Sequence, residues 1–214
     1  MTDQEFLAAA EGLSIRLSNE QAALFDRYEA LLRTWSLRVR LVSRGDRDRI
    51  RERHFIDSLR VTPFLPRGKI TLLDLGSGAG FPGVPVKIAR PEVKVVLLES
   101  ARMKGLFLNH LAGDLNLDGL SVLAERAEAA CERAEHRGRY DIVTARAVGA
   151  LPVLWRLSSG FLKKDGELLA LKGPGALREV EEFGPDGPDV SIESLATGRR
   201  HGNTMLVRIS ARRN

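Results

Sequence analysis

A glycine-rich segment that begins with an acid is the part of this sequence best suited to chemistry. Residues 74–80 read DLGSGAG, and Phe81 and Pro82 follow directly. Glycines adopt positive φ angles easily and let a backbone approach a ligand closely. A short apolar run precedes the segment, and a helical pattern follows it. The pattern D-x-G-x-G-x-G therefore predicts a loop that holds a nucleotide-containing cofactor.

The sequence of this loop is consistent with two kinds of cofactor. Residues 78–83 also spell G-x-G-x-x-G, the dinucleotide fingerprint, with Glu99 about 20 residues further on. A dinucleotide leaves Asp74 without a role, and its pyrophosphate repels a carboxylate. S-adenosylmethionine carries a positive sulfonium and a zwitterionic methionine end, which an acid and backbone donors suit better. We therefore expect S-adenosylmethionine. The loop residues expected to bind it are Asp74, Gly76, Gly78 and Gly80.

Two further segments are candidates for cofactor contacts because each follows an apolar run. Glu99 ends the run 94–99, where a carboxylate can accept hydrogen bonds from both ribose hydroxyls. The alternative is an acid that faces solvent. Ala127 and Glu128 follow the run 120–124, where a loop backbone can contact adenine, but Glu128 also suits a solvated helix face. The sequence favours the cofactor role at both places.

Motifs that the chain lacks disfavour two classes of methyl acceptor. Residues 144–148 read TARAV, in place of the D/N-P-P-Y/F loop that serves exocyclic amines. Cys131 lies in a helical pattern with no neighbouring proline, which disfavours attack on pyrimidine C5. A purine ring nitrogen such as guanine N7 offers an unprotonated lone pair, so it needs positioning and water exclusion and no general base. No catalytic acid or base is assigned.

Four side chains are candidates for positioning a substrate. Arg146 ends the fourth apolar run, where it can contact the cofactor, a base or a phosphate, or form a surface ion pair. His54 and Asp57 share a face of an expected helix and either take part in the reaction or form a structural network. Lys172 closes the fifth run, where it can meet an RNA phosphate or serve as a plain strand-end lysine.

Positive charge is concentrated near the N-terminal third of the chain. The whole chain has a formal net charge of +5. Residues 33–60 contain nine arginines against four acids, a local excess equal to that net charge. Such a cluster fits a polyanionic partner such as RNA, and it also fits a solvated, arginine-rich helix face. The sequence alone leaves both readings open.

The elements that must position these residues form two parts. Ser18 and Gln21 have the spacing of a capping box, and apolar residues from Leu24 to Trp35 then fall on one helical face. A second helix is expected over 46–60, which makes residues 1–66 a helical cap. Residues 67–214 are expected to form an α/β core, one compact unit with the cap. Seven short apolar runs predict its strands, in a mostly parallel sheet. These runs cover 70–75, 94–99, 120–124, 140–145, 167–172, 190–195 and 204–209.

Composition narrows the compartment and the range of cofactors. A single cysteine excludes an intramolecular disulfide and a cysteine-built metal site, and no metal is expected. No run of 18 apolar residues predicts a membrane span, and the first residues lack the pattern of an export signal. These features predict a cytoplasmic protein without membrane attachment.

Several of these segments together resemble one known family. Residues 53–58 (RHFIDS), 74–83 (DLGSGAGFPG) and 145–147 (ARA) are similar to blocks of the RsmG (GidB) family. Its members are Rossmann-like class I methyltransferases that methylate guanine N7 in 16S ribosomal RNA of the bacterial small subunit. The resemblance implies that substrate, with 16S ribosomal RNA or the small ribosomal subunit as partner, and a monomer. The implied cofactor contacts are Gly76, Phe81, Glu99, Ser100, Ala101, Ala127, Glu128 and Arg146.

One segment departs from the family pattern. Relatives commonly carry W-N-x-x-x-N-L-T after the second helix, whereas residues 35–42 read WSLRVRLV here, without either asparagine or the threonine. RNA recognition is therefore expected to depend more on Arg38, Arg40 and Arg44. Two alternatives to an RNA methyltransferase stay open, namely a small-molecule methyltransferase and a non-catalytic RNA-binding module on the same fold.

Overall fold

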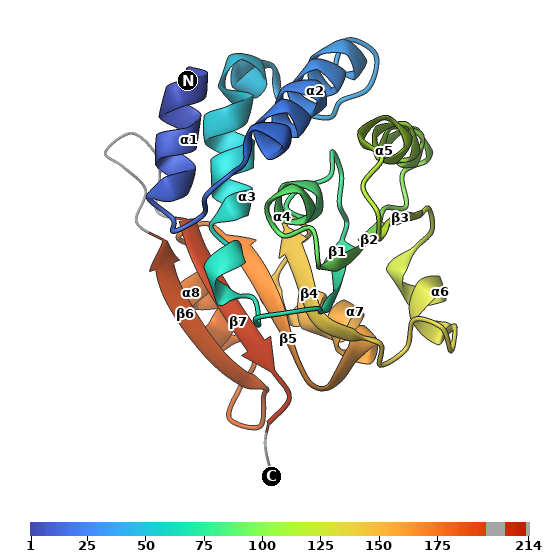
Figure 1. Ribbon diagram of the computed structural model, residues 1–214. Coiled ribbons are helices and arrows are strands. Elements are labelled where there is room, and N and C mark those ends of the chain that lie inside the picture. Colours follow the sequence, from blue (N-terminus) through green and yellow to red (C-terminus); the bar gives the residue numbers. More distant parts are fainter. Residues whose placement is uncertain (196–203, 213–214) are drawn as a thin grey trace.

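The computed structural model describes residues 1–195 and 204–212, and it has one seven-stranded sheet at its centre (Figure 1). The strand order is β3-β2-β1-β4-β5-β7-β6. The strands are β1 (Thr71–Leu75), β2 (Lys94–Leu98), β3 (Leu120–Leu123), β4 (Tyr140–Arg146), β5 (Leu162–Lys172), β6 (Asp189–Leu195) and β7 (Thr204–Ser210). β1 to β5 run parallel, and only the β5–β7 and β6–β7 pairs are antiparallel. The predicted mostly parallel α/β sheet is confirmed.

One strand begins earlier than predicted. β5 starts at Leu162, although the apolar pattern placed its start at Glu167. Lys163, Lys164 and Asp165 interrupt the apolar pattern there, and the register with β4 shifts between Tyr140 and Ile142. Gly166 lies at this irregularity, where an added Cβ would be 2.9 Å from the Tyr140 carbonyl oxygen. A bulge of this kind extends a strand beyond its apolar residues.

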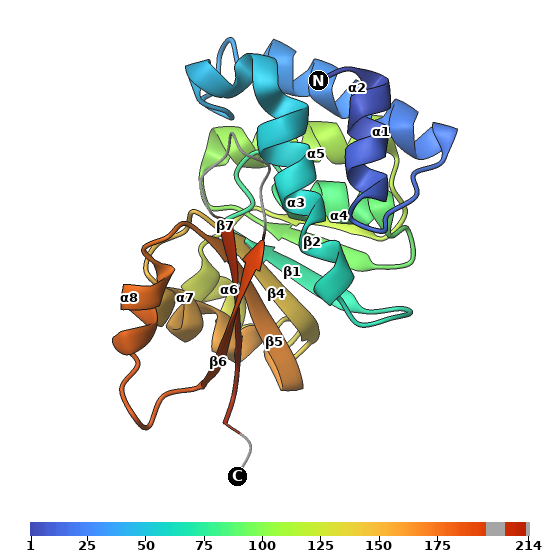
Figure 2. The same cartoon turned by 90° about the vertical axis from the view of Figure 1, so that its left-hand side faces the viewer.

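Helices cover both faces of the sheet (Figures 1 and 2). α4 (Gly83–Ala89) and α5 (Arg102–Leu115) pack on one face together with the N-terminal helices, and α6 (Ala127–Glu132), α7 (Leu151–Ser158) and α8 (Ala176–Glu181) pack on the other. Consecutive residues of β1 alternate between these layers, since Leu72 joins the first core and Leu73 joins the second. Burial on both faces explains why the strands read as continuous apolar runs.

Two N-terminal α-helices begin at capping boxes. α1 covers Asp3–Glu11, and α2 covers Asn19–Trp35. The Ser18 hydroxyl accepts a bond from the Gln21 amide nitrogen (3.2 Å), and the Gln21 side chain accepts one from the Ser18 nitrogen (2.8 Å). The predicted capping box and helix are confirmed. The Gln21 side-chain amide also donates to the Ile88 carbonyl (2.7 Å), which attaches the start of α2 to α4.

An aromatic cluster joins the N-terminal helices to the glycine loop. The Phe6 and Phe25 rings lie 5.0 Å apart, and Phe55 lies 5.0 Å from Tyr28. Phe81, at the end of the loop, lies 5.7 Å from Tyr28 and 6.1 Å from Phe55. Aromatic pairs at such separations stabilise a core beyond simple area burial. The loop therefore rests against side chains of the N-terminal helices.

The helix predicted over 46–60 is present, but it is divided into segments of different helical type. A 3-10 helix η1 (Arg44–Arg49) leads into a π-helix η2 (Arg51–Ile56) and a short α3 (Asp57–Leu59), and η3 (Thr62–Phe64) follows. Gly45, Asp46 and Asp48 are weak helix formers, and the Asp46 carboxylate accepts a hydrogen bond from the Ser43 hydroxyl (2.6 Å). This local bond tightens the first turn.

Within the part of the chain that the structure describes, no helix is long and apolar enough to cross a membrane.

Candidate functional site

The glycine loop follows the carboxyl end of β1 and turns back toward the end of β2. The Gly76 nitrogen donates to the Leu98 carbonyl (2.8 Å), and the Gly80 nitrogen donates to the Ser77 carbonyl (2.7 Å). Gly76 and Gly80 have φ angles of +67° and +99°. A Cβ at Gly76 would lie 2.8 Å from Val148 Cγ2, and one at Gly80 would lie 2.7 Å from the Tyr28 hydroxyl. Both positions require glycine for their conformation and for their space.

Asp74 stabilises this loop from beneath. Its carboxylate is fully buried and accepts hydrogen bonds from the Gly83 nitrogen (3.0 Å) and the Thr144 hydroxyl (2.9 Å). Burial raises the pKa of Asp74 to about 6, against the opposing effect of these bonds. The acid predicted to bind the cofactor thus lies behind the loop, where it fixes the turn between β1 and α4.

Glu99 joins the end of β2 to the loop. One carboxylate oxygen accepts from the Gly78 nitrogen (2.9 Å), and the other accepts from the Ala101 nitrogen (2.7 Å). The residue is 7% exposed. Each carboxylate oxygen can accept a second hydrogen bond. Glu99 is therefore already oriented by the backbone and keeps acceptor capacity for a ligand hydroxyl.

A cavity of about 180 Å³ opens at the carboxyl ends of the strands, and it is lined by Leu98 and Ser100, the neighbours of Glu99 in the sequence. Open α/β sheets bind their ligands at this edge. The cavity brings together the predicted residues Gly76, Ser100, Ala127 and Glu128. Its other lining residues are Leu75, Leu98, Glu125, Arg126, Val148 and Leu157. Ligand pockets usually measure about 300 Å³ or more, and the Val148 side chain over Gly76 occupies part of the space here.

A second cluster lies at the opposite end of the loop. The Arg146 guanidinium lies 5.8 Å from the centre of the Phe81 ring, and its Nη2 donates to the Arg53 carbonyl (2.8 Å). The same nitrogen is 3.8 Å from an Asp57 carboxylate oxygen. The His54 ring stacks on Phe81 at 4.9 Å with an interplanar angle of 10°. The predicted positioning residues Arg146, His54 and Asp57 are thus brought together around Phe81.

His54 is neutral at physiological pH. Burial, and then the positive charge of Arg146, lower the pKa of His54 to about 4, although the Asp46 carboxylate acts in the opposite direction. Its side chain is 14% exposed. A neutral imidazole can donate or accept a hydrogen bond and adds no positive charge to the site.

Several buried polar atoms around Phe81 have no hydrogen-bond partner among the described residues. They are Arg146 Nη1 and both ring nitrogens of His54. Buried polar groups nearly always have partners, so each exception requires an explanation. These atoms therefore keep unused donor and acceptor capacity near this end of the loop.

The basic residues predicted to bind RNA do not all lie together. The Lys172 ammonium pairs with Glu179 (2.8 Å) and donates to the Gly149 carbonyl (2.6 Å), so it supports the turn after β4. Arg38, Arg40 and Arg44 line a different cavity, between the end of α2 and η1. None of these residues lines the cavity beside Glu99.

The sequence reasoning missed the residue that attaches α2 to the loop. The Tyr28 hydroxyl donates to the Ala79 carbonyl (2.6 Å), and burial raises the pKa of Tyr28 well above 10. Its hydroxyl therefore stays a donor at physiological pH. A tyrosine on an apolar helix face could have signalled this contact, because a buried phenol usually finds a hydrogen-bond partner.

Comparisons with known proteins decide the family. The family model described as rRNA small subunit methyltransferase G matches residues 21–191. The chain belongs to the rRNA small subunit methyltransferase G family. A family member from Roseiflexus sp. strain RS-1 is 42% identical over 174 residues, which cover 81% of this chain and 74% of that protein. Another from Streptococcus equi subsp. zooepidemicus strain H70 is 38% identical over 184 residues, 85% of this chain and 78% of the relative.

Solved structures agree with the fold of this methyltransferase family. Cofactor-bound Rv0187 from MTB superposes with a TM-score of 0.61 at 16% identity, over 87% of this chain and 89% of that one. M. jannaschii TYW2 in complex with AdoMet gives a TM-score of 0.56 at 11% identity, over 81% of this chain and 78% of the other. Together with the family assignment, these findings confirm the predicted family, the Rossmann-like methyltransferase fold and the S-adenosylmethionine cofactor.

Proposed function

We propose that this protein transfers a methyl group from S-adenosylmethionine to guanine N7 in 16S ribosomal RNA of the small subunit. The observation that carries the proposal is the family match over residues 21–191, which includes most of α2 and the whole glycine loop. The small-subunit RNA comes from the name of the family, and guanine N7 comes from the resemblance in the sequence. We further propose that the protein acts in the cytoplasm, as a monomer, on free 16S RNA or on the small ribosomal subunit.

The cavity beside Glu99 suits the nucleoside part of the cofactor. Glu99 is held by the Gly78 and Ala101 nitrogens, with acceptor capacity left for the ribose hydroxyls. Ala127 and Glu128 begin α6 at the cavity wall, where the adenine edge would lie. The backbone of residues 76–80 is then available to bind the methionine end of the cofactor. When bound, S-adenosylmethionine supplies an electrophilic methyl group on a positive sulfonium.

The cluster around Phe81 suits a purine that is alkylated at a ring nitrogen. Attack by guanine N7 forms a nitrogen–carbon bond, breaks a sulfur–carbon bond and leaves the positive charge on the purine without loss of a proton. Asp57, 3.8 Å from Arg146, offers a negative charge near that position, and His54 adds no positive charge. Arg146 Nη1 is free to donate to an acceptor on the ligand. The residues position the base and stabilise charge, and none needs to remove a proton.

Methyl transfer from tritiated S-adenosylmethionine tests the proposal directly. Purified protein is incubated with protein-free 16S ribosomal RNA and, separately, with small subunits that lack the modification. We expect label in the RNA and, after borohydride reduction and aniline treatment, strand cleavage at a guanine. Label that appears only in a small molecule would favour the rival methyltransferase class. Binding of RNA and cofactor without any transfer would favour a non-catalytic module.

A matched pair of variants tests the cofactor site. Glu99→Gln removes the charge that accepts two backbone bonds and the ribose hydroxyls, so S-adenosylmethionine affinity should fall by about tenfold or more. Glu132→Gln removes the same charge from an exposed side chain of α6 that does not line the cavity, and it should change affinity little. Calorimetric titration measures both. Equal losses in the two variants would contradict the assigned role of Glu99.

A further inference from the structure

An arginine-lined cavity lies away from the cofactor site, where the chain turns after α2. It has a volume of about 510 Å³ and is formed entirely by residues between Ser36 and Arg47. Four of its lining side chains are arginines, namely Arg38, Arg40, Arg44 and Arg47. Among the described residues that line it, none is acidic. The cavity therefore presents positive charge without a compensating carboxylate on its walls.

The sequence builds this cavity by alternating buried and exposed residues. Val39 and Val42 are buried at 8% and 5% exposure and anchor the segment in the protein. Arg38 and Arg40 flank Val39 and are therefore held outward. Arg47 closes the turn, because its Nη2 donates to the Ser36 carbonyl. This alternation occupies the stretch where the chain departs from the asparagine and threonine pattern of the family.

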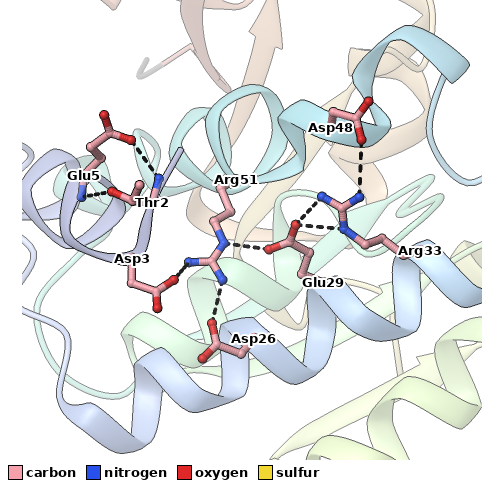
Figure 3. A network of polar contacts seen from close by, with 8 residues as sticks. All are labelled: Thr2, Asp3, Glu5, Asp26, Glu29, Arg33, Asp48 and Arg51. Atoms are coloured by element: carbon pink, nitrogen blue, oxygen red, sulfur yellow. Dashed lines mark hydrogen bonds and ion pairs between the residues drawn. The ribbon is translucent and has the colours of Figure 1, made fainter.

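The arginines of this cavity differ from their neighbours in having no acidic partners. Arg51 pairs with Asp3, Asp26 and Glu29 at 2.6–2.7 Å, and Glu29 also binds Arg33 (Figure 3). Arg38, Arg40 and Arg44 form no hydrogen bond or ion pair through their side chains with any described residue. The unneutralised positive charge of residues 33–60 is therefore gathered in one place.

Two buried polar atoms in the cavity wall also lack partners among the described residues. The Ser36 hydroxyl belongs to a residue that is 3% exposed, and Arg47 Nε is equally enclosed. Both residues line the cavity. A hydroxyl and a guanidinium nitrogen are donors that suit a phosphate oxygen. Their burial at the base of an arginine-lined hollow points to an anionic ligand.

We propose that this cavity binds a backbone phosphodiester of the RNA substrate. Guanidinium groups match phosphate oxygens in geometry and charge, and arginines are common at such contacts. Leu37 lines the same cavity and is 76% exposed, more than any other large apolar side chain in the described part of the chain. An apolar side chain beside a phosphate site suits the sugar or base that accompanies a phosphodiester. The inference rests on the proposed RNA substrate.

The cavity is positioned to direct the RNA toward the glycine loop. Asp46 lies in η1 between Arg44 and Arg47, and its carboxylate is 3.7 Å from Arg53 and 3.9 Å from His54. His54 in turn stacks on Phe81 at the end of the loop. A phosphate held by the arginines is therefore separated from the proposed base site by one short helix. An RNA strand bound there would present a neighbouring nucleotide to Phe81.

A double variant and a charge-matched control test this inference. Arg38→Gln with Arg40→Gln removes two cavity arginines. Arg27→Gln with Arg33→Gln removes two arginines that are paired with Asp114 and Glu29. Both are made in the full chain, and binding to protein-free 16S ribosomal RNA is measured over a salt series. Each lost phosphate contact reduces the salt slope by about 0.7 for single-stranded RNA, so the cavity variant should lose about 1.4 and the control little.

Kinetics separate this inference from the proposed function. The cavity variant should raise the KM for RNA about tenfold or more and leave kcat and S-adenosylmethionine affinity unchanged. An unchanged salt slope, or an equal loss in the control, would overturn the phosphate site. A wild-type protein that binds RNA without methyl transfer would instead overturn the proposed function, and the salt slopes would still decide the cavity. Polyglutamate that competes as strongly as polyuridylate would show a carboxylate site and also overturn the assignment.

Discussion

Two groups of arginines lie within the same short stretch of chain and have opposite surroundings. Arg51 is 13% exposed and pairs with three carboxylates from α1 and α2, whereas Arg38, Arg40 and Arg44 are exposed without acidic partners in the described structure. The first group joins helices to one another, and the second faces a cavity. The local excess of positive charge therefore contains arginines that stabilise the fold and arginines that remain available to a ligand. Ion pairs with carboxylates from distant parts of the chain distinguish the two kinds.

The difference arises from residues distant in sequence. Asp3, Asp26 and Glu29 are carried to Arg51 by the packing of α1 and α2 against η2. Near the cavity, the local acids are already engaged, since Asp46 accepts from Ser43 and Asp48 lies 3.5 Å from Arg33. The arginines after Trp35 are therefore left without carboxylates.

The largest effect is expected from Arg51→Gln. Removing one partner of a largely buried ion pair leaves carboxylates without compensation, so the free energy of unfolding should fall by about 3–4 kcal/mol. Urea denaturation measures this loss. RNA affinity of the folded variant should match the wild type. Arg33→Gln is the control, because Arg33 is 46% exposed and its loss should cost less than about 1 kcal/mol. Weaker RNA binding by a stable Arg51→Gln protein would break the comparison.

The next largest effect is expected in the pH dependence of stability, through His54. Its pKa is about 4 in the folded protein and 6.5 when exposed. Between these pH values the unfolded chain binds a proton that the folded protein does not. The contribution of His54 to stability is therefore complete above pH 6.5 and falls by up to about 3 kcal/mol as the pH decreases to 4. His54→Gln should flatten this part of the pH profile in urea unfolding, and an identical profile would refute the burial argument.

A smaller effect is expected from Glu29→Gln, which sharpens the comparison. This acid binds both Arg51 and Arg33, and Arg51 keeps Asp3 and Asp26 after its loss. Stability should fall by about 1–2 kcal/mol. The variant weakens the pairing of two arginines outside the cavity, so the salt slope for RNA should stay unchanged. A steeper slope would show that unpaired arginines bind RNA wherever they lie.

The smallest change in stability is expected from Ser36→Ala. Its hydroxyl is buried without a partner among the described residues, so its removal should alter the free energy of unfolding by less than about 0.5 kcal/mol or increase it slightly. The KM for RNA should rise a few-fold, because one donor to the phosphate is lost. Ser194→Ala, at an exposed serine of β6 outside the cavity, is the control, and the KM should not change there.

The sequence predicted what depends on local pattern. Short apolar runs predicted the strands, because the strands of a sheet covered on both faces are buried and therefore apolar. The glycine loop was predicted because the φ angles of Gly76 and Gly80 demand glycine. The type of helix over 46–60 was missed, since the Ser43–Asp46 bond and the contacts of Phe55 outweigh helical periodicity.

Residues of the candidate site likewise differ in whether a local sequence pattern could predict them. The positions of Glu99 and Ala127 could be predicted because each follows an apolar strand, and both lie at the carboxyl edge of the sheet. The position of Asp74 behind the loop, the Tyr28 contact with Ala79 and the ion pair of Lys172 with Glu179 depend on partners 7 to 70 positions away or on burial. Such contacts have no local pattern from which to predict them.

The hydrogen bond from Tyr28 to the Ala79 carbonyl has a consequence for protein engineering. A helical segment that recognises a substrate is attractive to exchange between relatives, in order to redirect one catalytic core to another RNA. Here the donor that fixes the cofactor loop belongs to that segment, and Gly80 leaves room for its hydroxyl. A chimera must therefore inherit the tyrosine and the glycine as a pair. An exchanged segment with phenylalanine at position 28 would leave the loop carbonyl unbonded before any RNA is bound.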